Sequence, residues 1–185
     1  MGDDHSAGRP LRADARRSRE RVLQVAQDAL AGDGLAVPLD EIARRAGFGL
    51  GIVHRHFPTE EALVEAVLVA RVERFAADAR ALATAAAPGE AFFGWFARLA
   101  GQAGAHRALG GLLEDGDHPA ARDLAAALGP LLARAQRAGA VRRDLGPDDV
   151  HDLLLGCLAA ERRARARGGG GRAVAVVCAG LRPPG

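Results

Sequence analysis

Arginine and histidine are the residue types in this sequence whose spacing suggests a chemical role. That role is the binding of a polyanion. Residues 9–21 hold six Arg and only two acidic residues, and His54, Arg55 and His56 form a second basic group. The whole chain carries a net charge of only +2. Positive charge concentrated near one end favours a polyanionic partner, although arginine-rich helix faces are often only solvated.

Groups suited to catalysis or metal binding are hard to find. His106 and His118 flank Asp115 and Asp117, but acidic loops are common and the spacing matches no metal motif. We see no nucleophile–base pair and no phosphate-binding loop, and the chain contains no Tyr. We therefore expect no enzyme, no metal site and no cofactor. A small helical enzyme that uses the 106–118 segment is the alternative left open.

The composition favours a helical globular chain. Its 185 residues are 49% hydrophobic and 26% charged, every basic residue is Arg, and aromatic residues are scarce. No apolar run approaches the roughly 20 residues that cross a bilayer, and the polar N-terminus lacks a secretory signal. Two cysteines, Cys157 and Cys178, are too few for a disulfide framework. We expect a cytoplasmic protein with no membrane contact.

Hydrophobic periodicity and helix-ending residues predict an all-α fold of about nine helices. A flexible arm at 1–10 comes first, Thr59 and Asp148 are expected to cap helices, and Gly129-Pro130 should kink or split one. The Gly168–Gly171 run is expected to be a flexible linker. The predicted helices cover 11–32, 39–46, 50–57, 59–87, 90–104, 106–114, 119–139, 148–165 and 172–181.

The segment 39–57 gives the sharpest functional signal. It reads as two short helices joined by a three-residue turn, in which Gly47 and Gly49 supply the positive φ that a tight turn needs. Apolar residues then lock the second helix onto its neighbours; they are Phe48, Val53 and Phe57. This is helix-turn-helix geometry, whose second helix enters the major groove of DNA. Plain helix packing is the alternative reading.

The residues from Arg12 to about Ala70 resemble the DNA-binding domain of the TetR family of bacterial transcriptional regulators. The matching positions are Arg21–Leu23, Ala26, Asp40–Phe48, Gly51, Arg55–Phe57 and Thr59–Leu63. The resemblance implies a DNA-binding domain over 11–58 and a helical ligand-binding and dimerisation domain over 59–185. Three further segments look similar to family members with an SbtR-type C-terminal domain: Gly139–Arg142, Pro147–Val150 and Gly180–Pro183.

The second short helix departs from the family pattern. Gly49 and Leu50 stand where a Ser or Thr and a basic residue are usual, Ile52 replaces a Thr, His54 replaces a Tyr, and Glu60 replaces a Lys. These changes remove or alter four DNA contacts. The alternative function is therefore a ligand sensor or scaffold whose DNA-binding head is weakened.

The residues expected to contact DNA lie in and around the helix-turn-helix segment. The arginines are plausible phosphate partners or a solvated face, and the two histidines contact DNA or cover the small core. Leu50 and Ile52 suit thymine methyl groups. The set is Arg16, Arg17, Arg44, Leu50, Gly51, Ile52, His54, Arg55, His56 and Thr59.

An effector site is expected in the aromatic segment 90–114. Bulky rings opposite several glycines leave space for a small molecule, and two polar side chains four residues apart would orient it. The absence of charge from Ala91 to Ala97 favours an apolar or aromatic effector. A close-packed core is the alternative. The expected ligand-binding residues are Phe92, Trp95, Phe96, Gln102 and His106.

Apolar stripes on the last two predicted helices favour a homodimer. Two such stripes are more than one subunit readily covers, so pairing with a symmetry mate would form a four-helix interface. The expected interface residues are Val150, Leu154, Cys157, Leu158, Val174, Val177 and Leu181. The whole is predicted to act as a repressor that releases a pseudo-palindromic operator when a small molecule binds.

Overall fold

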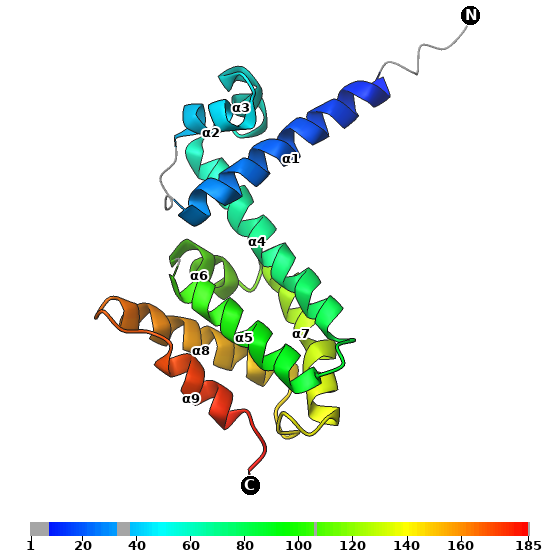
Figure 1. The fold of residues 1–185 in the computed structure, drawn as a ribbon, viewed down its shortest axis with the longest axis vertical. Coiled ribbons are helices and arrows are strands. Elements are labelled where there is room, and N and C mark those ends of the chain that lie inside the picture. The colour runs from blue at the N-terminus through cyan, green and yellow to red at the C-terminus, as the bar shows by residue number, and fades with distance from the viewer. Residues whose placement is uncertain (1–7, 33–37, 106, 185) are drawn as a thin grey trace, which may run out of the picture. The chain divides into compact units, whose positions relative to one another are not determined.

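The fold is all-α, as predicted (Figure 1). In this computed structural model, the described residues, 8–32, 38–105 and 107–184, form nine helices and no strand. None of these helices is long and apolar enough to span a membrane. The helices are α1 Gly8–Gly32, α2 Leu39–Ala46, α3 Leu50–His56, α4 Glu60–Leu82, α5 Pro88–Ala105, α6 Arg107–Glu114, α7 Pro119–Arg137, α8 Pro147–Arg165 and α9 Arg172–Gly180.

The chain divides into two compact units, Met1–Val67 and Leu68–Gly185. The first unit holds α1, α2, α3 and the start of α4 around a small apolar core. That core draws one or more buried side chains from every one of these helices, including Val22, Ile42, Val53 and Leu63. Small residues such as Ala26 and Ala43 let the helices approach closely at the centre of this core.

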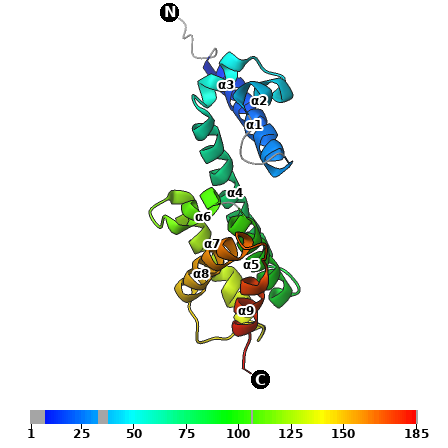
Figure 2. The same cartoon turned by 90° about the vertical axis from the view of Figure 1, so that its left-hand side faces the viewer.

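The second unit is built around α5. This helix packs against α6, α7, α8 and α9, and α8 runs beside α9 (Figure 2). Arg162 of α8 donates a 2.7 Å hydrogen bond to Glu114 of α6. Its guanidinium lies against Gly110, where an added Cβ would come within 2.5 Å of Nη1.

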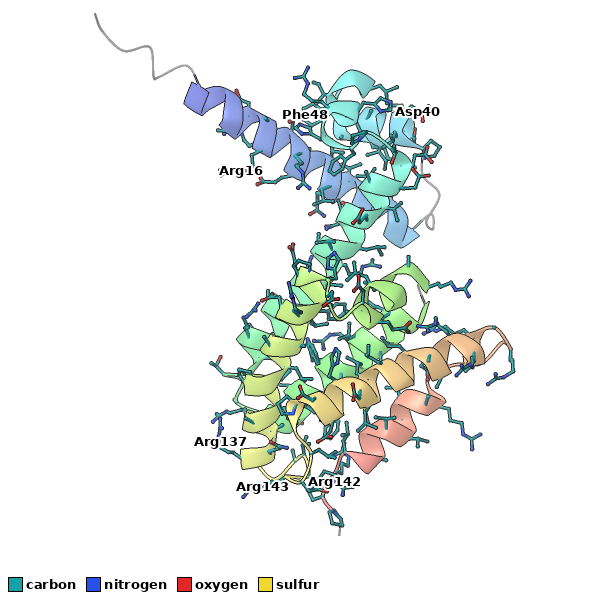
Figure 3. The ribbon with its side chains drawn as sticks, turned by 180° about the vertical axis from the view of Figure 1, so that it is seen from behind. Arg16, Asp40, Phe48, Arg137, Arg142 and Arg143 are labelled. Atoms are coloured by element: carbon teal, nitrogen blue, oxygen red, sulfur yellow. The ribbon has the colours of Figure 1, made fainter. Side chains whose placement is uncertain are left out.

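The connection between α7 and α8 is tied to the end of α9. Arg142 and Arg143 lie in this connection (Figure 3). The backbone N–H of Arg142 donates to the carbonyl of Leu181 at 2.9 Å, and the side chain of Gln136 donates to the carbonyls of Arg142 and Leu145 at 2.9 Å each. The C-terminal segment is therefore held to the domain by backbone pairing as well as by the buried Leu181.

Two helix boundaries differ from the sequence prediction by three residues or more, and one predicted interruption does not split its helix. Helix α1 begins at Gly8, so the last residues of the predicted arm 1–10 are helical, while 1–7 lie outside the described residues. Helix α4 ends at Leu82 instead of about 87. Helix α7 runs through Pro130 without a split. The carbonyl that proline leaves unpaired belongs to Ala126, and both residues are exposed, so water can satisfy it.

One of the two predicted caps is confirmed. The hydroxyl of Thr59 accepts the N–H of Ala62 at 3.2 Å, as an N-cap should. The Asp148 prediction is wrong: Gly146 is the cap residue of α8, and its N–H donates to the carboxylate of Asp149 at 2.7 Å. Helix α8 therefore begins at Pro147, a favoured residue for the first turn.

The glycine run before α9 is an ordered turn instead of the predicted flexible linker. Gly168 and Gly171 have φ of 78° and 80°, which only glycine adopts readily. The carboxylate of Glu161, fully buried, accepts the N–H groups of Gly171 at 2.6 Å, Ala173 at 3.1 Å and Val174 at 3.3 Å. One side chain of α8 thus caps the N-terminus of α9.

Candidate functional sites

The turn between α2 and α3 is made by a single left-handed glycine. Gly47 has φ of 76°, and its N–H and that of Phe48 return to the carbonyls of Arg44 at 3.3 Å and Ala43 at 3.0 Å. Gly49 has φ of −69° and simply precedes α3, so the prediction that both glycines need positive φ is wrong for Gly49. An added Cβ at Gly49 would meet no atom within 4 Å.

Helix α3 has one inward and one outward side. Val53 is fully buried and Phe57, just after the helix, is 2% exposed, which confirms their predicted locking role. On the outward side, Leu50 is 42% exposed and Ile52 is 37% exposed. Large apolar side chains on a helix that also carries basic residues are available to contact a partner.

His56 lies at the contact between α3 and α1. Its Nε2 is 2.9 Å from the hydroxyl oxygen of Ser18, and that hydroxyl donates its proton to the carbonyl of Ala15. Ser18 must therefore accept, and His56 Nε2 must donate. This bond forms with either the neutral or the charged imidazole, so His56 positions α3 against α1 and its Nε2 is already used.

His54 is exposed on the outward side of α3. Its Nδ1 lies 3.3 Å from the carbonyl oxygen of Pro58. Since a carbonyl can only accept, Nδ1 carries the proton, and Nε2 is the atom left to face a partner.

Two arginines of α2 share one carboxylate. Arg44 donates from Nε and Nη2 to Glu41 at 2.8 and 2.7 Å, and Arg45 donates from Nε to Glu41 at 2.7 Å. These hydrogen bonds lower the pKa of Glu41 to about 2, and those from Arg44 have the larger effect. Glu41 therefore stays ionised and fixes the orientation of Arg44, which remains exposed.

The remaining expected DNA contacts are exposed residues with local partners. Arg16, labelled in Figure 3, lies on α1 with its Nε 3.6 Å from the carboxylate of Glu20, and Arg17 of the same helix donates to Asp14. Exposed pairs of this kind contribute little to stability and are easily exchanged for a phosphate. Thr59 is engaged locally, because its hydroxyl caps α4. The pKa of Glu61 is lowered, first by a hydrogen bond from the backbone N–H of Glu61 and then by one from the side chain of Thr59.

The aromatic side chains of α5 form the centre of the second unit's core. Phe92, Trp95 and Phe96 are all fully buried, and Trp95 Nε1 donates to the carbonyl of Phe75 at 2.9 Å. The rings of Phe92 and Phe96 lie 6.2 Å apart. Gln102 is exposed, so it does not join the three rings, contrary to prediction. His106 lies outside the described residues.

The predicted interface residues divide into two groups. Five are buried within their own subunit and have no surface left for a second copy; they are Val150, Leu154, Cys157, Leu158 and Leu181. Val174 and Val177 are half-buried on α9. Leu153 and Val176, which were not among the predicted interface residues, are 39% and 64% exposed. Helical periodicity alone does not tell which of two apolar stripes on α8 faces inward.

An open hollow of about 670 Å³ lies between α8 and α9. Its apolar lining includes Leu153, Val176 and Val177, and its charged lining is Asp149, Asp152 and Arg172. Cys157 also reaches the hollow, but burial raises the pKa of its thiol to about 11, so the thiol is protonated at neutral pH.

Asp115 and His118, which were weighed as metal ligands, make hydrogen bonds with backbone groups near them in the chain. His118 caps α7, its Nδ1 accepting the N–H of Ala120 at 3.1 Å. Asp115 accepts the N–H of Asp117 at 3.1 Å within the preceding turn. No cluster of three potential metal ligands occurs among the residues that the structure describes.

Comparison with known proteins identifies the class. The model of the tetR family of bacterial regulatory proteins matches residues 22–67, and that of the SbtR-like C-terminal domain of transcriptional regulators matches 87–183. No protein of curated function matches the chain. The chain belongs to the TetR family: it is a DNA-binding transcriptional regulator and not an enzyme.

Solved structures agree. A TetR transcription regulatory protein from Mycobacterium vanbaalenii is 45% identical, with 94% of this chain and 100% of that chain covered and a TM-score of 0.66. The regulator SCO0520 from Streptomyces coelicolor is 31% identical, with 90% and 99% covered and a TM-score of 0.66. RolR, solved with resorcinol, shares the fold at 22% identity, 93% and 91% coverage and a TM-score of 0.60.

Proposed function

We propose that the protein is a homodimeric, ligand-responsive repressor that releases a pseudo-palindromic operator when a small molecule binds. The observation that carries the proposal is the outward side of α3, where Leu50 and Ile52 are exposed beside His54 and Arg55 while Val53 fixes the helix from within. A regulator of this kind works in the cytoplasm, where it meets its DNA.

Operator contact would combine two kinds of interaction. Arg44 and Arg55 meet phosphates, which positions α3 without reading sequence. Leu50, Gly51 and Ile52 face the base edges, where apolar side chains favour thymine methyl groups. A two-fold dimer would then require half-sites whose centres lie about one helical turn or more apart.

The dimer would form through the face made by α8 and α9. Leu153 and Val176 are exposed there, and the hollow between the helices offers space for a partner's side chains. Asp152 and Arg172 give the same face both signs of charge. A two-fold interface pairs a surface with itself, so a face with both signs suits a second copy better than one with a single sign.

The effector would be a small apolar or aromatic molecule bound beside α5. Phe92, Trp95 and Phe96 place three buried aromatic rings in the domain that matches the SbtR-like model, and the resorcinol complex of RolR shows that a protein of this fold takes an aromatic ligand. Release of DNA requires the effector to favour the non-binding state by a coupling free energy of about 1–3 kcal/mol.

Binding to the DNA upstream of the coding region tests the operator. We expect a shifted band with an inverted repeat from that region, a much weaker one with a scrambled duplex, and steep loss of affinity with salt. Equal binding to both duplexes would favour the other candidate, a sensor or scaffold with a weakened DNA-binding head. The exposed Glu60 in the first turn of α4 supports this candidate, because its charge would repel phosphate.

Fluorescence of Trp95, the single tryptophan, tests the effector site. Saturable quenching by aromatic compounds, accompanied by release of the operator, would support it. Phe96→Ala should abolish the quenching while the protein stays folded. No response to any compound, together with the roughly 3–5 kcal/mol loss of a filled core site in Phe96→Ala, would leave the three rings as core only.

A further inference from the structure

The exposed histidine of α3, His54, is hydrogen-bonded through its Nδ1. The hydrogen bond from His54 Nδ1 to the carbonyl oxygen of Pro58, 3.3 Å long, requires the proton to sit on Nδ1. The neutral ring therefore presents the lone pair of Nε2 outward. Only the charged imidazolium has an N–H on both nitrogens and can donate from Nε2 while it keeps the bond to Pro58.

The position of His54 on α3 suits a backbone contact. It lies four residues after Leu50, one turn further along the same side, and is exposed like Leu50. The first residues of a recognition helix are those nearest the base edges, so a residue one turn later is closer to the edge of the groove. A lone pair aimed at a phosphate oxygen repels it, whereas an imidazolium N–H binds it.

We propose that His54 is a proton-dependent phosphate contact, made by the imidazolium and not by the neutral ring, so that operator affinity rises as pH falls through the titration range of histidine. This inference rests on the proposed function, and it adds a regulation of the same DNA-binding site. Acidification of the medium would then strengthen repression without any effector.

The charged groups around His54 are carried by α3 and by the elements near it. Its helix also carries Arg55 and His56, and the elements around α3 carry Arg16, Arg17, Arg19, Glu20, Asp40, Glu41, Arg44, Arg45, Glu60 and Glu61. Among the described residues, no ion pair joins His54 to a carboxylate. Glu41 is engaged by two arginines and Glu61 by Thr59. An approaching phosphate is thus the anion that stabilises the imidazolium.

The second histidine of α3 provides an internal control. His56 donates from Nε2 to Ser18, and this bond is present in both the neutral and the charged ring. Its contribution to the position of α3 therefore does not change with protonation. His56→Asn should lower affinity at every pH but leave the slope of affinity against pH unchanged.

The test measures binding of the full-length protein to the upstream inverted repeat between pH about 5.5 and about 8, at constant ionic strength. For the wild type we expect affinity to rise by at least about tenfold towards the acidic end. His54→Tyr donates a hydroxyl proton at every pH and should bind without that rise. His54→Ala should bind at least as tightly as the wild type at the basic end, where the neutral ring repels phosphate, and fall behind it at the acidic end.

Several outcomes would overturn the proposal. A wild type that binds the repeat equally at all pH values, or a His54→Tyr variant that keeps the full slope, contradicts it while leaving the proposed function intact. Nitrogen NMR shifts showing that the neutral His54 ring carries its proton on Nε2 would do the same. Failure of wild type and His54→Tyr alike to prefer the repeat over a scrambled duplex at any pH would instead defeat the proposed function, and this inference with it.

Discussion

Two surfaces of this protein expose large apolar side chains, and they differ in the charges around them. On α3, Leu50 and Ile52 are accompanied by His54, Arg55 and His56, with no acidic residue in the helix. On the face formed by α8 and α9, Leu153 and Val176 lie among acidic and basic side chains. Exposed apolar area is typical of contact surfaces, and the sign of the neighbouring charge is the reason we propose a polyanion for one and a second copy for the other.

The two surfaces also differ in how they are held. Helix α3 is fixed from within, because Val53 and Phe57 are buried in the core of its unit. None of the nine residues of α9, all of them described, is buried, and the helix is held at its start by Glu161 and just after its end by Leu181. The outward side of α3 is thus fixed within one subunit, whereas we propose that the α9 surface is completed by a second copy.

The largest expected effect comes from introducing like charges on the α8–α9 face. Leu153→Glu combined with Val176→Glu should give monomers, because both exposed side chains would place carboxylates in an apolar contact. Operator affinity should fall by at least about a hundredfold, since each monomer holds one half-site. Sedimentation velocity and anisotropy measure the two effects. Ala126→Glu, at an exposed position of α7, should change neither.

Loss of the buried carboxylate should give the next largest effect. The N–H of Gly171 most of all, and then those of Val174 and Ala173, hold the pKa of Glu161 below its usual range despite burial. Glu161→Gln should lower the free energy of unfolding by about 2–3 kcal/mol, the value of hydrogen bonds to a charged group. Thermal unfolding measures it.

The same variant has a predictable pH dependence. Because the folded-state pKa of Glu161 is lowered, its stabilisation is fully present above the ordinary glutamate value of about 4.3 and is lost as pH falls through the folded-state value. The difference in melting temperature between wild type and Glu161→Gln should therefore shrink in acid. A difference that is constant down to strongly acidic pH would contradict the capping role.

A smaller, sequence-independent effect is expected at the basic residues of the DNA-binding unit. Arg55→Ala should weaken binding to specific and scrambled duplexes alike by about tenfold and reduce the slope of log affinity against log salt by about 1 per phosphate contact. Arg44→Ala should behave similarly. Arg137→Ala, an exposed arginine of α7, serves as the control for lost charge. A loss confined to the specific duplex would show that the arginines read bases.

The smallest effect on total affinity, and the most informative for the comparison, is expected at the apolar residues of α3. Ile52→Ala should leave binding to scrambled DNA unchanged and reduce discrimination at one base pair by about 1 kcal/mol, through loss of a thymine methyl contact. A set of single-base operator variants locates that base pair. An unchanged preference at every position would show that Ile52 does not face the bases.

The sequence predicted most of the fold because helix ends are local. The Gly47 turn, the Thr59 cap and the limits of α2 follow from residues within a few positions of each other. Some errors, such as the Asp148 cap and the φ of Gly49, were local, whereas others arose where distant groups decide. The partner of Gly171 is ten residues away in Glu161, and which stripe of α8 faces inward depends on α5.

The candidate DNA-binding site was likewise predicted in part from local sequence and in part only from coordinates. The inward position of Val53 followed from the sequence pattern, whereas the exposure of Leu50 did not, because residues three apart lie near the same face of a helix. The tautomer of His54 and the link from His56 to Ser18 required coordinates, because each depends on which oxygen lies within about 3 Å of a ring nitrogen. Glu41 could have been found earlier, since it stands three and four residues before two arginines on one helix.

The small number of contacts that hold α9 has a consequence for local opening of the structure. A helix with no buried side chain of its own loses little apolar burial when it detaches. Its amides should therefore exchange with solvent through a local opening whose free energy is far below that of global unfolding. If a second subunit covers it, that opening must wait for dissociation. Amide exchange in α9 should therefore slow as protein concentration rises, while exchange in α5, with its buried rings, stays constant.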